Sequence, residues 1–150
     1  MRTVTLGKTG ITVNKNGFGA LPIQRVSLEK AVDILHKAYD HGVNFYDTAR
    51  FYTDSEEKLG AAFSDRREKI YIASKTAAQN AEDFWKDLAV TLGNLKTDYL
   101  DIYQFHNPSF CPKPGDGSGL YEAMLEAKAQ GKIRHIGITN HRLAVAREAI

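Results

Sequence analysis

The sequence lacks the features that mark several classes of protein. Its 150 residues include one cysteine, Cys111, so no disulfide can form within the chain, and no Cys/His cluster has the spacing of a zinc site. No apolar run approaches the roughly 18 to 20 residues of a membrane span, and residues 1–5 carry no apolar signal-peptide segment. Twenty basic and 18 acidic residues give a net charge of +2, which excludes a strong field for nucleic acid. We therefore expect a cytoplasmic protein without metal, nucleic-acid or membrane partners.

The composition that remains is typical of one folded domain. Hydrophobic residues make up 43% of the chain and charged residues 25%. A chain of this length buries roughly 70% of the surface that its unfolded state exposes, so it can form a true core. Residues 1–15 alternate apolar and polar side chains around the turn sequence Gly7-Lys8-Thr9-Gly10, which predicts a β-hairpin. We expect a single domain over residues 1–150.

Residues 17–150 repeat one unit, a short apolar strand followed by a loop and an amphipathic helix. The expected strands are 17–21, 43–47, 70–74, 99–105 and 133–138. Their starts lie about 29 residues apart, which is typical of βα units in a parallel sheet. Two architectures remain open from this pattern, a doubly wound sheet and a (β/α)8 barrel. The glycine-rich phosphate turn that usually follows the first strand of a doubly wound sheet is missing.

Three helix starts carry capping residues. Ser27 precedes an apolar stripe and predicts an N-cap, and Gly42 marks the end of the same helix. Asn80 with Asp83, and Asp54 with Glu57, each resemble a capping box.

Four polar residues stand at or just after the ends of successive strands. Asp47 ends the second strand, Tyr52 follows it in the loop, Lys75 comes after the third strand, and His106 after the fourth. Because the carboxyl ends of parallel strands face the same side of a sheet, these side chains are expected to converge. Taken one at a time, such residues are more often turn formers, solvated surface charges or half-buried rings than members of a site. Their joint occurrence favours a site.

The chemistry that suits this set is protonation of a carbonyl oxygen. A phenol with a pKa near 10 is a weak acid at neutral pH. A nearby ammonium stabilises the phenolate and lowers that pKa, a carboxylate fixes the ammonium, and a histidine orients the carbonyl oxygen. A cofactor must then supply hydride.

Several longer motifs resemble those of the aldo/keto reductases, and they occur in order along the whole chain. They are Gly42-Val43-Asn44-Phe45-Tyr46-Asp47-Thr48-Ala49 with Tyr52, Asp54-Ser55-Glu56-Glu57-Lys58-Leu59-Gly60, Ala73-Ser74-Lys75, Asp98-Tyr99-Leu100-Asp101 leading to His106, and Gly131-Lys132-Ile133-Arg134-His135-Ile136-Gly137-Ile138-Thr139-Asn140. The opening residues 6–10 and the stretch 17–24 are most similar to a bacterial branch, some members of which carry a C-terminal iron–sulfur segment. No such segment occurs here.

The resemblance implies a (β/α)8 barrel whose bottom is closed by the hairpin and which reduces aldehydes or ketones with NADPH. It makes Tyr52 the general acid, tuned by Lys75 and Asp47, with His106 orienting the carbonyl. It places Thr139 and Asn140 on the nicotinamide carboxamide, and Gly19 and Ala20 where the first strand meets the cofactor.

The length departs from the family pattern. Eight units would need about 230 residues, whereas residues 17–150 hold five. In the family the later strands and loops contact the pyrophosphate, the 2′-phosphate and one face of the nicotinamide. We therefore expect a truncated barrel that alone binds NADPH weakly and reduces little small carbonyl substrate. The alternative is a non-catalytic partial barrel that self-associates, or binds another chain, through exposed edge strands.

Overall fold

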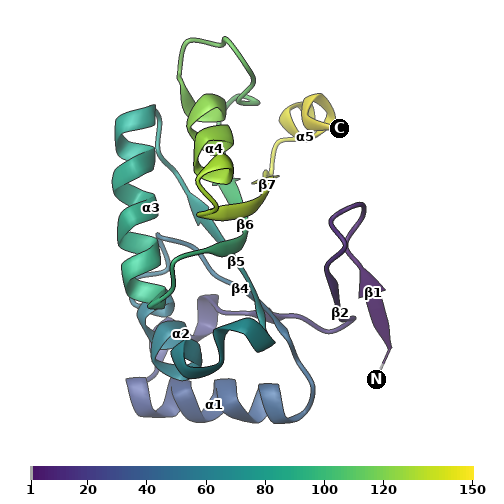
Figure 1. Ribbon diagram of the computed structural model, residues 1–150, viewed down its shortest axis with the longest axis vertical. Coiled ribbons are helices and arrows are strands. Elements are labelled where there is room, and N and C mark those ends of the chain that lie inside the picture. Colours follow the sequence, from purple (N-terminus) through teal and green to yellow (C-terminus); the bar gives the residue numbers. More distant parts are fainter. Residues whose placement is uncertain (1) are drawn as a thin grey trace.

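The computed structural model describes residues 2–150, and the chain begins with the expected hairpin. Strands β1 (Thr3–Thr5) and β2 (Thr12–Asn14) pair antiparallel. The side chain of Asn14 ties the hairpin to the rest of the molecule, because its Nδ2 donates to the carbonyl oxygen of Gly42 at 3.0 Å. The hairpin lies across the sheet from the helices (Figure 1). Of the expected span 1–15, residue 1 lies outside the described residues.

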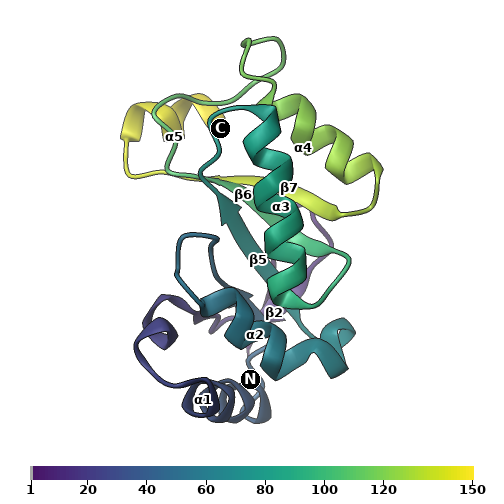
Figure 2. The same ribbon diagram turned by 90° about the vertical axis from the view of Figure 1, so that its left-hand side faces the viewer.

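Five parallel strands form the main sheet. They are β3 (Phe18–Gly19), β4 (Phe45–Asp47), β5 (Tyr71–Thr76), β6 (Leu100–His106) and β7 (Ile133–Thr139). Neighbours in the sheet follow the order of the sequence, β3-β4-β5-β6-β7. Each strand is connected to its neighbour through a helix, and these connections have the same handedness. In a sheet whose strand order follows the sequence, all the connecting helices then lie on one face, as Figures 1 and 2 show. A doubly wound sheet needs a reversal of strand order, and residues 2–150 contain none. The fold is therefore of the (β/α)8-barrel type, with five βα units.

The helices lie between and after these strands. They are the 3-10 helix η1 (Leu21–Arg25), α1 (Leu28–Asp40), α2 (Ser55–Phe63), the 3-10 helix η2 (Ser64–Lys69), α3 (Ala81–Leu95), α4 (Leu120–Ala129) and α5 (Leu143–Ala149). Two expected caps are confirmed. Ser27 Oγ accepts from the amide of Lys30 at 3.3 Å, and Asn80 Oδ1 accepts from the amide of Asp83 at 2.9 Å.

The structure corrects two local predictions. The first strand is shorter than 17–21, because the chain turns into η1 at Leu21, with Pro22 in its first turn. The capping box at Asp54 is wrong, since its side chain makes no cap hydrogen bond. Instead its carboxylate accepts from Lys58 Nζ at 2.8 Å, and the buried ammonium also donates to the carbonyl oxygen of Ile23 at 3.0 Å. This ammonium lowers the pKa of the Asp54 carboxyl.

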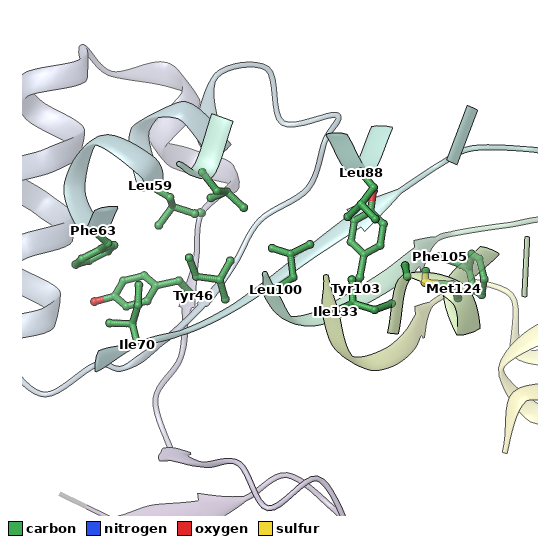
Figure 3. Packing of buried hydrophobic residues seen from close by; sticks show 14 of the residues in the cluster. Tyr46, Leu59, Phe63, Ile70, Leu88, Leu100, Tyr103, Phe105, Met124 and Ile133 are labelled. Carbon is green, nitrogen blue, oxygen red and sulfur yellow. The ribbon is translucent and has the colours of Figure 1, made fainter. Parts of the chain in front are cut away.

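One hydrophobic core fills the space between the sheet and the helices. Side chains alternate along each strand, so Tyr46, Ile72 and Tyr103 point to the helices and are fully buried. Figure 3 shows Tyr46 beside Phe63, and the two ring centroids are 4.6 Å apart. The alternate residues, among them Asp47 and Lys75, face the opposite side of the sheet. Asp47 and Lys75 therefore share the face of the sheet that the helices do not cover.

A cluster of charged residues near the amino ends of the strands holds β6 to its neighbours. The carboxylate of Asp101 is fully buried and accepts from Arg67 Nη2 at 2.7 Å, from Arg134 Nη1 at 2.9 Å and from the amide of Ile72 at 2.9 Å. The ring of Tyr99 has both guanidinium groups within cation–π range, at 4.1 Å and 4.2 Å from its centroid. This network joins η2, β5, β6 and β7.

Gly60 lets α2 lie directly against the end of α3. A Cβ at this position would lie 2.2 Å from the carbonyl oxygen of Asn94 and 2.9 Å from the carbonyl carbon of Leu95. Gly60→Ala is therefore expected to lower the free energy of unfolding by about 1–3 kcal/mol, measured by urea denaturation. Gly93→Ala is the matched control, because nothing lies within 4 Å of its added Cβ, and it is expected to be neutral or stabilising. Equal stability of the two variants would contradict the close approach.

Candidate active site

The four residues predicted from the strand ends come together at one edge of the sheet. Asp47 is the last residue of β4, Lys75 is the last but one of β5, and His106 is the last of β6. Tyr52 lies in the loop between β4 and α2. Backbone bonds fix this loop, with the Tyr52 amide donating to the carbonyl oxygen of Ala49 at 3.0 Å. The convergence expected of parallel strands is thus present.

Lys75 is the centre of the cluster. Its side chain is buried, with the residue 4% exposed, so its charge needs close partners. Nζ donates to Asp47 Oδ1 at 2.5 Å and to the carbonyl oxygen of Thr48 at 2.6 Å. These bonds use two of the three N–H donors of the ammonium. Nζ also lies 5.0 Å from the centroid of the Tyr52 ring. The ammonium is therefore held in place beside the phenol.

His106 packs against Tyr52, and its surroundings lower the pKa of its imidazole. The two rings meet edge to face, with centroids 5.7 Å apart at an angle of 83°. Burial, and next the Lys75 ammonium, lower the pKa of His106 below its ordinary 6.5, while the Asp47 carboxylate opposes them. Nδ1 is buried and has no hydrogen-bond partner among the described residues. A neutral imidazole carries one N–H donor and one acceptor.

These charges predict how the titration of His106 responds to substitution. Lys75→Met removes a positive neighbour and is expected to raise the pKa of His106, whereas Asp47→Asn is expected to lower it further. NMR titration of the ring protons measures both changes. Lys86→Met, at an exposed position on α3, is the control and should leave the titration unchanged. Equal pKa values of His106 in all four proteins would show that Lys75 and Asp47 do not act on it.

Two further side chains support the cluster and were not predicted from the sequence. Gln104 Nε2 donates to Asp47 Oδ2 at 3.4 Å. Glu56, which is 1% exposed, accepts from Ser74 Oγ at 2.6 Å and from Thr91 Oγ1 at 2.9 Å, so α2 and α3 are tied to the residue before Lys75. Gln104 stands two residues before His106 and therefore on the same face of β6. That two-residue spacing is the only signal in the sequence that places Gln104 on the side of the cluster, and it does not show what Gln104 contacts.

The four residues expected at the cofactor lie at the carboxyl ends of two strands. Gly19 and Ala20 end and follow β3, and Thr139 and Asn140 end and follow β7. Thr139 is the register partner of His106, and Gly19 is that of Asp47. The amide of Asn140 is already engaged, since Nδ2 donates to the carbonyl oxygen of Pro108 at 2.7 Å. Ala20 is fully buried.

No metal-binding group of three or more His, Cys, Asp or Glu side chains occurs among residues 2–150. Within the same residues, no helix is both long enough and apolar enough to cross a membrane.

The fold and the cluster define a barrel-type protein with a candidate acid–base site at the carboxyl ends of its strands. Comparison with known proteins gives the family. Residues 15–149 match the model of the aldo/keto reductase family. The chain belongs to this family, which confirms the resemblance of its motifs.

Individual relatives agree with this assignment. The chain is 30% identical to an uncharacterized oxidoreductase of Bacillus subtilis, YqkF, over 100% of its own length and 52% of the relative. It is 32% identical to methylglyoxal reductase DkgB of Salmonella typhi, over 93% of the chain and 52% of the relative. An aldo-keto reductase of Klebsiella pneumoniae solved in complex with NADPH superposes with a TM-score of 0.82 at 28% identity, over 97% of this chain and 52% of that one. The chain spans about half the length of the relatives it matches.

Proposed function

We propose that this chain carries the proton-donating site of an NADPH-dependent reductase that converts aldehydes or ketones to alcohols. One observation carries the proposal. A buried ammonium, fixed by a carboxylate and a backbone carbonyl oxygen, lies beside a half-buried phenol at the carboxyl edge of the strands. This is the arrangement that makes a phenol an effective acid.

Each residue has one role in the reaction. Tyr52 gives its hydroxyl proton to the carbonyl oxygen of the substrate, and the Lys75 ammonium stabilises the phenolate that remains. Asp47 holds the ammonium on the side of Tyr52. A ring N–H of His106 donates a hydrogen bond to the same carbonyl oxygen and so orients it. When bound, NADPH would supply the hydride that the carbonyl carbon gains, and water would then return a proton to Tyr52.

The residues near β7 fit the nicotinamide end of the cofactor. A carboxamide needs one acceptor for its NH₂ and one donor for its oxygen. Asn140 donates through one N–H to Pro108 and accepts from the amide of Arg142 at 2.7 Å, which leaves one N–H and one lone pair. The Thr139 hydroxyl donates to the carbonyl oxygen of Phe105 at 3.4 Å, and its oxygen remains as an acceptor beside His106. Gly19 has open space where a side chain would stand, so a flat ring can approach it. Ala20 contributes through its backbone, which joins β3 to β4 by donating to the carbonyl oxygen of Asp47 at 2.8 Å.

Methylglyoxal is a suitable first substrate, because three relatives are named as its reductase. The test adds NADPH and methylglyoxal to the protein and follows the oxidation of NADPH together with the alcohol formed. NMR of the His106 ring during NADPH addition reports binding separately. Because the chain is expected to bind NADPH weakly, we expect slow reduction at saturating NADPH, with equal amounts of NADPH consumed and alcohol produced, and a shift of the His106 signals. Saturating NADPH that neither shifts His106 nor reduces any of a panel of small aldehydes and ketones would overturn the proposal and favour a non-catalytic role.

A further inference from the structure

Gln104 lies at the middle of the candidate site without being one of the four residues that define it. In the register of the sheet it stands between Lys75 on β5 and Gly137 on β7. Its Nε2 donates to Oδ2 of Asp47 at 3.4 Å, while Oδ1 of the same carboxylate accepts from Lys75. Both oxygens of the carboxylate therefore have a donor, one charged and one neutral.

Gly137 provides the room in which the Gln104 side chain lies. A Cβ at position 137 would stand 2.9 Å from Cγ, 3.4 Å from Oε1 and 3.5 Å from Cδ of Gln104. The backbone there has no positive φ, so its conformation does not require a glycine. Because Gly137 on β7 has no side chain, the Gln104 side chain on β6 has space to lie beside it.

We infer that Gln104 is a positioning residue, which holds Asp47 so that its carboxylate keeps one oxygen on the Lys75 ammonium. The inference rests on the proposed function. The Asp47 side chain is 36% exposed, so without a second donor its carboxylate is free to turn toward water. A neutral donor prevents this turn and leaves the charge of the Asp47–Lys75 pair unchanged. A lysine or arginine at position 104 would instead compete with Lys75 for the carboxylate.

A double-mutant cycle separates positioning from a general structural role. Gln104→Leu is expected to lower kcat for carbonyl reduction about three- to ten-fold, the effect of one hydrogen bond, with little change in KM for the carbonyl. In an Asp47→Asn background the same substitution should have almost no further effect, because Gln104 acts through the carboxylate. If Gln104→Leu lowers kcat by the same factor in both backgrounds, the inference is wrong.

Gly137→Ala tests the same contact from the other side. The added methyl displaces the Gln104 side chain, so this variant should reproduce the loss of kcat seen in Gln104→Leu. Gly93→Ala, which adds a methyl in open space on α3, should keep the wild-type kcat. Urea denaturation of all variants shows whether each still folds. A folded Gly137→Ala variant with wild-type kcat counts against the inference.

An NMR measurement tests the contact between Gln104 and the Asp47 carboxylate even if no reductase activity is found. The carboxylate ¹³C shift of Asp47 reports the donors around its two oxygens. We expect this shift to change in Gln104→Leu and in Gly137→Ala and to stay constant in Gly93→Ala. An unchanged shift in Gln104→Leu overturns the contact. Changed shifts in a protein that reduces no carbonyl overturn the proposed reaction and retain the positioning of Asp47.

Discussion

Tyr52→Phe is expected to lower the rate of carbonyl reduction by a factor of about 10² to 10⁴, the usual contribution of a positioned general acid. The substitution removes only the hydroxyl. The phenylalanine ring still packs edge to face on His106, and Lys75 keeps its bonds to Asp47 and to Thr48. Steady-state kinetics with NADPH and methylglyoxal measures the loss. Binding of NADPH should stay nearly unchanged, because the nicotinamide end is assigned to β7 and not to Tyr52.

Tyr39→Phe is the matched control. Tyr39 lies on α1, on the helix side of the sheet, with its ring 6.0 Å from that of Phe63. It loses the same hydroxyl far from the cluster, so we expect wild-type kinetics. Comparable rates for Tyr52→Phe and Tyr39→Phe would remove Tyr52 from the reaction.

Asp101→Asn is expected to have the largest effect on stability, about 3–5 kcal/mol. The amide can still accept from the Ile72 N–H, but it no longer neutralises the two guanidinium groups. The side chain of Arg134 is 52% exposed and can turn to water. Arg67 cannot, because its side chain is 8% exposed and would be left as a buried charge without a counter-ion. Urea denaturation measures the change in the free energy of unfolding.

Asp65→Asn supplies the control for this prediction. Asp65 also pairs with an arginine, Arg66, at 2.8 Å, but its side chain is 64% exposed. Exposed pairs contribute between 0 and about 1 kcal/mol, so this variant should unfold nearly as the wild type does. Equal losses in both variants would mean that the Asp101 network is no more important than a surface ion pair.

The sequence predicted the strand–helix order and the four strand-end residues because both follow from local rules. Strand ends in a parallel sheet share one edge, so Asp47, Lys75 and His106 are expected together before any geometry is known. The choice between a doubly wound sheet and a barrel-type sheet was not decided by residue pattern. Both architectures use the same βα unit, and only the order of strands in the sheet distinguishes them.

Some features could not be predicted from the sequence because they depend on contacts between residues that are far apart in the chain. Asp54 has the right residue type for a cap, but a buried ammonium four residues later, held also by Ile23, draws its carboxylate away from the amides of the first turn. The second partner of Lys75 is the carbonyl oxygen of Thr48, and any residue type supplies a carbonyl oxygen. Gln104 is one of several polar residues on β6, and its type alone does not assign it a role. Its importance depends on Asp47 and Gly137, which come from two other strands.

Hydride transfer from NADPH that carries deuterium at both C4 positions tests the central claim most directly. Methylglyoxal is the carbonyl substrate, and mass spectrometry locates deuterium in the product of the wild type and of Tyr52→Phe. We predict deuterium on the former carbonyl carbon with the wild type, at a rate lower by about a hundredfold or more with Tyr52→Phe. Equal rates of deuterium incorporation by the two proteins would contradict the proposed site. An alcohol without deuterium from the wild type would contradict it as well.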